Sequence, residues 1–195
     1  MRISAKKLRI LFVDDEELET PKALKTEGYD VEHWRDVENL DHLCDGRYQI
    51  ILLDVRGIGE KYGGNGLDIL KYIATHNPLI YVCVFSAKPF TGEEAEIIRK
   101  FAKKAITKDC TIYDLIEIFE SYASTLSERS MMDMIENQFK LNFIDKWKLR
   151  HGYQLSQNRL EKISNASQIG VDAIKIARNM ISGSIILYKL FHGIV

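Results

Sequence analysis

The sequence predicts an α/β fold: a doubly wound, five-stranded parallel sheet with helices on both faces, followed by a small all-helical region. Two observations support the sheet. Short apolar runs such as Leu8–Val13 and Leu79–Phe85 alternate with amphipathic segments of helix length across residues 1–125. The runs are apolar almost throughout, which is typical of parallel strands buried on both faces. Right-handed crossovers between such strands produce an open sheet with a crevice at the carboxyl ends of the strands.

Each element follows from its own residues, taken in chain order. The first helix is expected to have Thr20 as its N-cap and Pro21 at its first position, and to end before Gly28. A helix at Gly66–His76 is indicated by apolar residues, including Leu70, that recur on one face. The remaining expected strands are Val31–Arg35, Tyr48–Leu53 and Lys104–Thr107, and the remaining expected helices are Val37–Cys44, Gly92–Lys103 and Ile112–Tyr122.

The chain of 195 residues has the composition of a globular protein, with 46% hydrophobic and 28% charged residues. This balance excludes a disordered chain and a collagen-like repeat. A net charge of −1 argues against a surface that is basic throughout and binds nucleic acid over its whole extent. The three cysteines, Cys44, Cys83 and Cys110, have neither a disulfide-scaffold nor a metal-ligand spacing, which favours a reducing cytoplasm.

Targeting and membrane segments are not expected. The N-terminal residues reach Asp14 before any long apolar run, so they do not have the pattern of a signal peptide. The most apolar stretch, residues 181–195, is interrupted by Lys189 and is shorter than the ~20 residues that span a bilayer. We therefore expect a cytoplasmic protein without a membrane span.

Charge divides the chain into two regions. Residues 1–125 hold 17 basic and 22 acidic residues, a balance of −5, whereas residues 126–195 hold 10 and 6, a balance of +4. The polar patch Ser124–Ser127 lies between two helical patterns and marks the boundary. We expect one domain at 1–125 and a helical output or interaction region at 126–195.

Polar side chains stand where the predicted strands end. Asp14 and Asp15 follow the first strand, Asp54 follows the third, Ser86 follows the fourth, and Lys108 follows the last. The carboxyl ends of parallel strands share one edge of a sheet, so these side chains are expected to converge on the crevice.

Three clustered carboxylates repel one another and lose hydration on burial, so the site requires positive charge. A hard divalent ion with oxygen ligands is the usual solution, and Mg²⁺ fits a site with few direct carboxylates. Lys108 adds a fixed ammonium. A carboxylate beside Mg²⁺, a lysine and a hydroxyl suits phosphoryl transfer onto that carboxylate.

Five motifs in order resemble the receiver domain of bacterial two-component response regulators. They are ILFVDD (Ile10–Asp15), IILLDV (Ile50–Val55), GLDIL (Gly66–Leu70), VFSAK (Val84–Lys88) and AITKD (Ala105–Asp109). The resemblance covers residues 7–122 and implies a flavodoxin-like receiver fold. It also implies a signalling protein rather than an enzyme, phosphorylated by a histidine kinase or a phosphotransfer protein. The resemblance does not extend to residues 126–195.

The resemblance assigns a role to each strand-end residue. Asp54 corresponds to the phosphoacceptor, and Mg²⁺ is expected to be held by Asp14, Asp15, Asp54 and the backbone carbonyl of Arg56. Ser86, Ala87 and Lys108 correspond to the residues that bind the phosphoryl group and respond to it.

Three features depart from the family pattern. Ala105 occupies the position of the usual aromatic switch residue, and Asp109 replaces the usual proline after the lysine. The loop from Val55 to Asn65 is longer than the common form and places Arg56 near the phosphoacceptor as a second positive group. A phosphate-independent adaptor with the receiver fold is therefore an alternative function.

The second region has a helical pattern. Residues 130–149 carry Ile135, Phe139, Phe143 and Trp147 along one ridge, which is typical of a core or a helix–helix contact. We expect a small helical bundle, closed by the apolar tail 180–195, that signals through protein contacts or self-association.

A DNA-binding output is the other alternative. Residues 158–180 have the spacing of a helix-turn-helix. The side chains that such a motif would direct toward DNA are Asp172, Lys175, Arg178 and Asn179.

Overall fold

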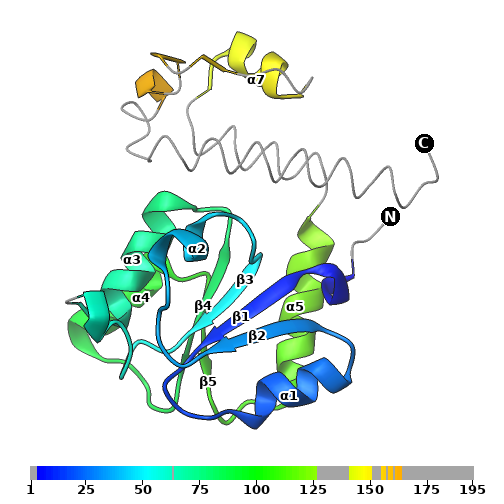
Figure 1. The fold of residues 1–195 in the computed structure, drawn as a ribbon, viewed down its shortest axis with the longest axis vertical. Helices are drawn as coiled ribbons and strands as arrows, with labels where there is room; N and C mark the ends of the chain where they lie inside the picture. Colours follow the sequence, from blue (N-terminus) through cyan, green and yellow to red (C-terminus); the bar gives the residue numbers. More distant parts are fainter. Residues whose placement is uncertain are drawn as a thin grey trace. The chain divides into compact units, whose positions relative to one another are not determined.

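The computed structural model of the chain describes residues 4–62, 64–126, 141–150, 155–156, 158–159 and 161–163. By its internal contacts the chain divides into two units, Met1–Thr125 and Leu126–Val195. The first unit contains the sheet and the helices that surround it (Figure 1).

Five parallel strands form the sheet in the order β2-β1-β3-β4-β5 (Figure 1). Strand order reverses at β1, which pairs with β2 on one side and with β3 on the other. In such sheets a crevice opens at the carboxyl ends of the strands beside the reversal. The strands are β1 Arg9–Val13, β2 Asp30–Trp34, β3 Ile50–Leu53, β4 Tyr81–Ser86 and β5 Lys104–Thr107. The predicted doubly wound, five-stranded parallel sheet is confirmed.

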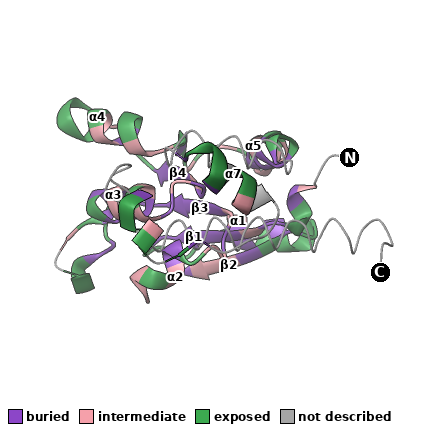
Figure 2. Ribbon diagram, turned by 90° about the horizontal axis from the view of Figure 1, so that it is seen from above, coloured by how far each residue is buried: buried purple, intermediate pink, exposed green. Residues whose placement is uncertain are grey.

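Helices cover both faces of the sheet, with α1 and α5 on one face and α2, α3 and α4 on the other (Figure 2). Their bounds are α1 Glu19–Thr26, α2 Leu40–Cys44, α3 Gly66–His76, α4 Gly92–Phe101 and α5 Ile112–Thr125. Short 3₁₀ turns occur at Ala5–Lys7 and Glu60–Tyr62.

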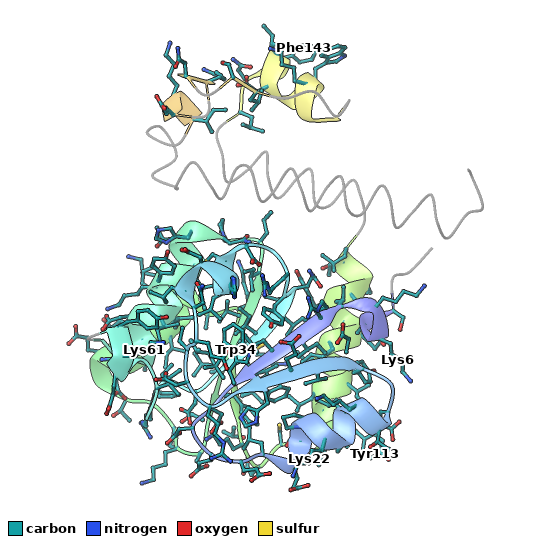
Figure 3. All side chains as sticks on the ribbon, in the orientation of Figure 1. Lys6, Lys22, Trp34, Lys61, Tyr113 and Phe143 are labelled. Atoms are coloured by element: carbon teal, nitrogen blue, oxygen red, sulfur yellow. The ribbon has the colours of Figure 1, made fainter. Side chains whose placement is uncertain are left out.

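The core lies on both faces of the central strands, because β1, β3 and β4 are buried along almost their whole length (Figure 2). Phe12 and Phe85 meet edge to face, with ring centroids 5.8 Å apart. Trp34, labelled in Figure 3, packs edge to face against Tyr48 with centroids 5.7 Å apart. This burial explains why the strand sequences are apolar without alternation.

Two helix starts differ from the predicted ones. α1 begins at Glu19 after Leu18, which makes no capping hydrogen bond with its side chain, so Thr20 is not the N-cap. Pro21 therefore stands within the first turn, where backbone N–H groups have no acceptor within the helix and the absence of one costs no hydrogen bond. α2 begins at Leu40 rather than Val37, because the Asn39 side chain accepts from the first backbone N–H groups of the helix.

Two other helix ends have clear local causes. Gly28 lies just past α1 with φ +87°, a left-handed conformation that glycine adopts without steric cost. α3 has the predicted bounds because Asn65 and Asp68 form a capping box at its start.

Gly66, the first residue of α3, approaches the backbone that follows β3. A Cβ atom at this position would lie 2.2 Å from the Cα of Val55 and 2.8 Å from the carbonyl oxygen of Asp54. Only a residue without a side chain permits this approach, and the approach fixes the chain immediately after Asp54.

The second unit contains α7, Phe143–Arg150. Asn142 and Asp145 exchange capping hydrogen bonds at its start, and Asp145, 3% exposed, forms an ion pair with Arg159. Phe143 is 83% exposed on this helix (Figure 3). The predicted helix-turn-helix at 158–180, apart from a few of its first residues, and the apolar tail lie outside the described residues.

Across the part of the chain that the structure describes, no helix is long and apolar enough to cross a membrane.

We predict that Gly66→Ala lowers the free energy of unfolding by about 2–3 kcal/mol, because the added methyl group overlaps the Val55 backbone. Urea unfolding followed by circular dichroism measures the change. Gly64→Ala is the matched control, since a Cβ there meets only the Asp68 side chain, at 3.1 Å or more, and no backbone atom. Equal stability of the two variants would show that the close approach is not required.

Candidate functional site

The carboxyl ends of the strands bring the predicted polar residues together. Asp14 directly follows β1, Asp54 directly follows β3, and Lys108 directly follows β5. Backbone hydrogen bonds from Asp14 N to Trp34 O and from Asp54 N to Val13 O, 3.0 and 2.9 Å long, extend the strand pairing to both aspartates. Their positions are therefore fixed by the sheet.

Three carboxylates form a cluster with the chemistry of a magnesium site. Oxygen atoms of Asp14, Asp15 and Asp54 all lie within 4.8 Å of one another. Asp14 and Asp54 are 1% and 5% exposed, whereas Asp15 is exposed. The buried Oδ2 atom of Asp14 has the Lys108 ammonium, 2.8 Å away, as its charged neighbour. An all-oxygen donor set of three carboxylates fits a hard cation that retains several waters, as Mg²⁺ does.

Lys108 is the positive charge inside the cluster. Its Nζ lies 2.7 Å from Asp54 Oδ2 and 2.8 Å from Asp14 Oδ2, and it donates a hydrogen bond of 3.0 Å to Asp14 Oδ1. The exposed Glu16 carboxylate is 3.3 Å from the same nitrogen. Burial alone would lower the pKa of Lys108, but the hydrogen bonds with Asp14 and Asp54 raise it above its usual value.

For Asp14, unlike Lys108, the effect of burial on the pKa outweighs that of the hydrogen bonds. Its removal from water raises the pKa of its carboxyl group, and the hydrogen bond from Lys108 only partly reverses this effect. The Glu16 backbone N–H also donates to Asp14 Oδ1, at 3.1 Å. The ionised Asp14 carboxylate is therefore under-compensated by the protein alone.

Ser86 ends β4 at the same edge of the sheet, but its hydroxyl group does not bind the carboxylates in this structure. The Oγ atom donates to the Lys88 carbonyl at 3.2 Å and accepts from the Lys88 N–H at 3.4 Å. Ser86 is 2% exposed, whereas Ala87 is exposed. The Ser86 carbonyl accepts the Lys108 N–H at 2.9 Å, which connects the ends of β4 and β5.

Arg56 contacts the cluster through its backbone. Its N–H donates to Asp54 Oδ1 at 3.0 Å, while its carbonyl group remains a predicted metal ligand. Gly57, with φ +74°, then passes so close to Asp15 that a Cβ atom would lie 2.6 Å from the carboxylate. The loop after β3 therefore closes one side of the cluster.

The guanidinium of Arg56 extends toward α4, a contact that sequence reasoning missed. Its Cζ atom lies 4.9 Å from the centre of the Phe90 ring, and one nitrogen lies 3.5 Å from Glu94. The unusual loop containing Arg56 was the only signal in the sequence.

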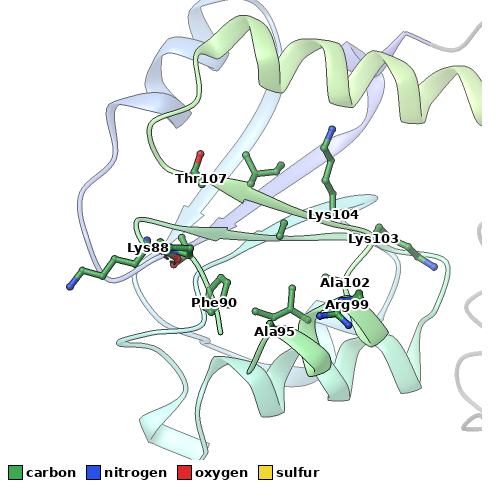
Figure 4. A pocket seen from close by; sticks show the side chains of 13 residues that line it. Lys88, Phe90, Ala95, Arg99, Ala102, Lys103, Lys104 and Thr107 are labelled. Atoms are coloured by element: carbon green, nitrogen blue, oxygen red, sulfur yellow. Dashed lines mark hydrogen bonds between the residues drawn. The ribbon is translucent and has the colours of Figure 1, made fainter. Parts of the chain in front are cut away.

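A pocket of about 470 Å³ lies between α4 and β5 (Figure 4). Residues of α4, among them Ile98 and Arg99, and the whole of β5 line it, and Ser86 stands among the lining residues. Ala105 offers only a methyl group there, and the side chain is exposed. The position without the usual aromatic residue is therefore part of an open pocket. Its basic members are Lys88, Arg99, Lys103 and Lys104.

The predicted DNA-contact residues Asp172, Lys175, Arg178 and Asn179 lie outside the described residues.

We predict that, without Mg²⁺, Asp14→Asn stabilises the protein at neutral pH. The folded-state pKa of Asp14 is raised, so the stability contributed by its neutral form is present below the unfolded pKa and is lost as pH rises through the folded pKa. The advantage of the variant therefore shrinks as pH falls toward 4 and below. Urea unfolding at several pH values in a chelating buffer measures it. A variant less stable than the parent at pH 7 would contradict the prediction.

No family model matches the chain, and no curated protein matches it in sequence. Similarity to solved structures does exist. A response regulator receiver domain protein, described as CheY-like, from Methanospirillum hungatei JF-1 is 22% identical, with a TM-score of 0.52. The match covers 60% of this chain and 93% of that one.

A second solved structure is that of NtrX from Brucella abortus in complex with ATP. It is 21% identical, with a TM-score of 0.51, over 80% of this chain and 34% of that one. At 21–22% identity these similarities show a shared fold. The strand order and flanking helices of residues 4–125 are those of a response regulator receiver domain, and residues 126–195 remain unassigned.

Proposed function

We propose that the chain is a response regulator that accepts a phosphoryl group on Asp54 from a histidine kinase or a phosphotransfer protein in the cytoplasm. One observation carries the proposal: the Lys108 ammonium bridges Asp14 and Asp54 within a cluster of three carboxylates. A structural ion pair needs only one carboxylate, and the additional acids make the site unfavourable without a further cation.

Asp54 is the nucleophile in this proposal because both of its oxygens are oriented by the protein. The Arg56 N–H holds Oδ1, and the Lys108 ammonium holds Oδ2. A carboxylate oxygen attacks phosphorus in line, the bond from phosphorus to the donor breaks, and the donor leaves with the bonding electron pair. An acyl phosphate forms, and with a phosphohistidine donor the imidazole is released.

Lys108 is positioned to exchange partners during transfer. In this structure its ammonium is shared among carboxylates, and a phosphoryl group on Asp54 presents new anionic oxygens beside it. Asp14, Asp15 and Asp54 would hold Mg²⁺, together with the predicted Arg56 carbonyl. The ion, when bound, offsets the negative charge of the phosphoryl oxygens. Ser86 would have to leave the Lys88 backbone before its hydroxyl could bind those oxygens.

The output is proposed to pass through residues 126–195 by protein contacts. In the described part of this region, Phe143 and Ile144 of α7 are 83% and 61% exposed. Neighbouring exposed apolar side chains of this kind favour contact with another protein surface. This observation supports a protein-contact output and does not bear on DNA.

We predict that incubation with acetyl phosphate and Mg²⁺ adds one phosphoryl group to the parent and none to Asp54→Asn. Intact-mass spectrometry measures the addition, with a chelator as the metal-free arm. Asp109→Asn is the control, because Asp109 is an exposed acid beside Lys108 that does not belong to the cluster. Absence of labelling on the folded parent would refute the phosphoacceptor assignment and favour the phosphate-independent adaptor.

We also predict that Mg²⁺ stabilises the protein through the carboxylate cluster. At a concentration about 100 times the dissociation constant, binding adds about 2.7 kcal/mol, which corresponds to a rise in Tm of about 5–10 °C. Differential scanning calorimetry measures the rise. Asp15→Asn is expected to abolish most of it and Asp109→Asn to retain it. A similar rise in Tm for the parent and both variants would show that the ion binds outside the carboxylate cluster.

A further inference from the structure

Arg56 contacts two parts of the molecule at once. Its backbone N–H donates to Asp54 Oδ1 at 3.0 Å. Its guanidinium stacks over Phe90 and pairs with Glu94, which lies in the first turn of α4. One residue therefore connects the proposed phosphoacceptor to the start of α4.

The start of α4 has few other attachments. Of its ten residues only Ile98 is buried, and the Thr91 side chain makes no capping hydrogen bond. α3, by contrast, buries five residues and has a capping box. Helix ends with little burial and few hydrogen bonds open most readily. The Arg56 contacts therefore contribute a large share of the interactions that hold this turn in place.

The Arg56 contacts with α4 are also the kind that a phosphoryl group can displace. The side chains of Arg56 and Glu94 are 42% and 48% exposed, and ion pairs at such exposure are weak. A phosphoryl group offers a guanidinium two oxygens in bidentate geometry and more negative charge than one carboxylate. Because the Arg56 backbone N–H already binds Asp54, the Arg56 side chain is attached close to the place where the phosphoryl group would form.

We propose that Arg56 is a latch that holds the first turn of α4 before phosphorylation and transfers to the phosphoryl oxygens afterwards, releasing that turn. The proposal rests on the phosphorylation of Asp54 proposed above. It assigns Arg56 a positioning role that needs no aromatic side chain at Ala105. Phe90 lines the pocket between α4 and β5, so release of Phe90 and α4 reshapes that pocket (Figure 4).

Hydrogen exchange of the full chain, followed by mass spectrometry of peptides covering 92–101, tests the latch. Without phosphate, Arg56→Gln and Glu94→Gln are expected to exchange the first amides of α4 about three- to tenfold faster than the parent, because the turn has lost its tether. Arg35→Gln is the matched control, since Arg35 forms an exposed pair with Glu17 at the same 3.5 Å in another part of the unit. It is expected to leave these peptides unchanged.

Hydrogen exchange measured after phosphorylation distinguishes a latch from a contact that only stabilises the fold. Phosphorylation of the parent is expected to raise exchange in 92–101 to the level of unphosphorylated Arg56→Gln, while phosphorylated Arg56→Gln shows no further rise. Unchanged exchange in the phosphorylated parent, or an equal rise in the variant, would overturn the latch.

Intact mass on the same samples shows whether Asp54 carries the phosphoryl group. Absence of labelling would reject the proposed function and the latch with it. Labelling without an exchange response would reject the latch alone.

Discussion

The Lys108 ammonium sits between two buried carboxylates, and the geometry of the crevice depends on that charge. Lys108 follows the edge strand β5, whereas Asp14 and Asp54 follow the central strands β1 and β3. Its ion pairs therefore join residues that are far apart in sequence, 94 positions in the case of Asp14, and span the end of β4. The backbone bond from Lys108 to Ser86 supports this path. One ammonium facing three acids leaves excess negative charge, so the same arrangement that stabilises the sheet edge also calls for a cation.

The positions of the site residues were predictable because parallel strands impose them. Once buried strands were recognised, the residue after each strand had to lie at one edge of the sheet, whatever the helices did. The helix boundaries were less predictable where several polar residues compete for the cap. Asn65 is followed by Asp68 at capping-box spacing and α3 began as predicted, whereas Thr20 resembled a cap and was not used. The direction of the Ser86 hydroxyl is set by its hydrogen bonds to the Lys88 backbone. The conformation of that backbone cannot be read from the order of residue types.

The contacts between Arg56, Phe90 and Glu94 could not be derived from the sequence. They depend on where α4 lies above the sheet, and helix position is set by packing rather than by spacing along the chain. The unusual loop was a partial signal for the Arg56 contact and Ala105 for the pocket, but neither indicates that the loop reaches α4 or that a pocket remains beside β5. In residues 126–195 the apolar pattern predicted a helix over 130–149, but Leu141 and Asn142 are not helical and α7 begins at Phe143, where Asn142 supplies the cap. A pattern alone does not identify what such a helix contacts.

The close approaches of Gly57 and Gly66 have a consequence for protein engineering. Each glycine pins one end of the loop after β3, and a Cβ atom at Gly59 would also collide with Ile69. Changes in loop length are therefore confined to the exposed turn Glu60–Tyr62. A short epitope or a fluorophore-binding tag inserted there would extend into solvent and leave the carboxylate cluster intact. The loop thus offers a place to attach a reporter beside the site without rebuilding the site itself.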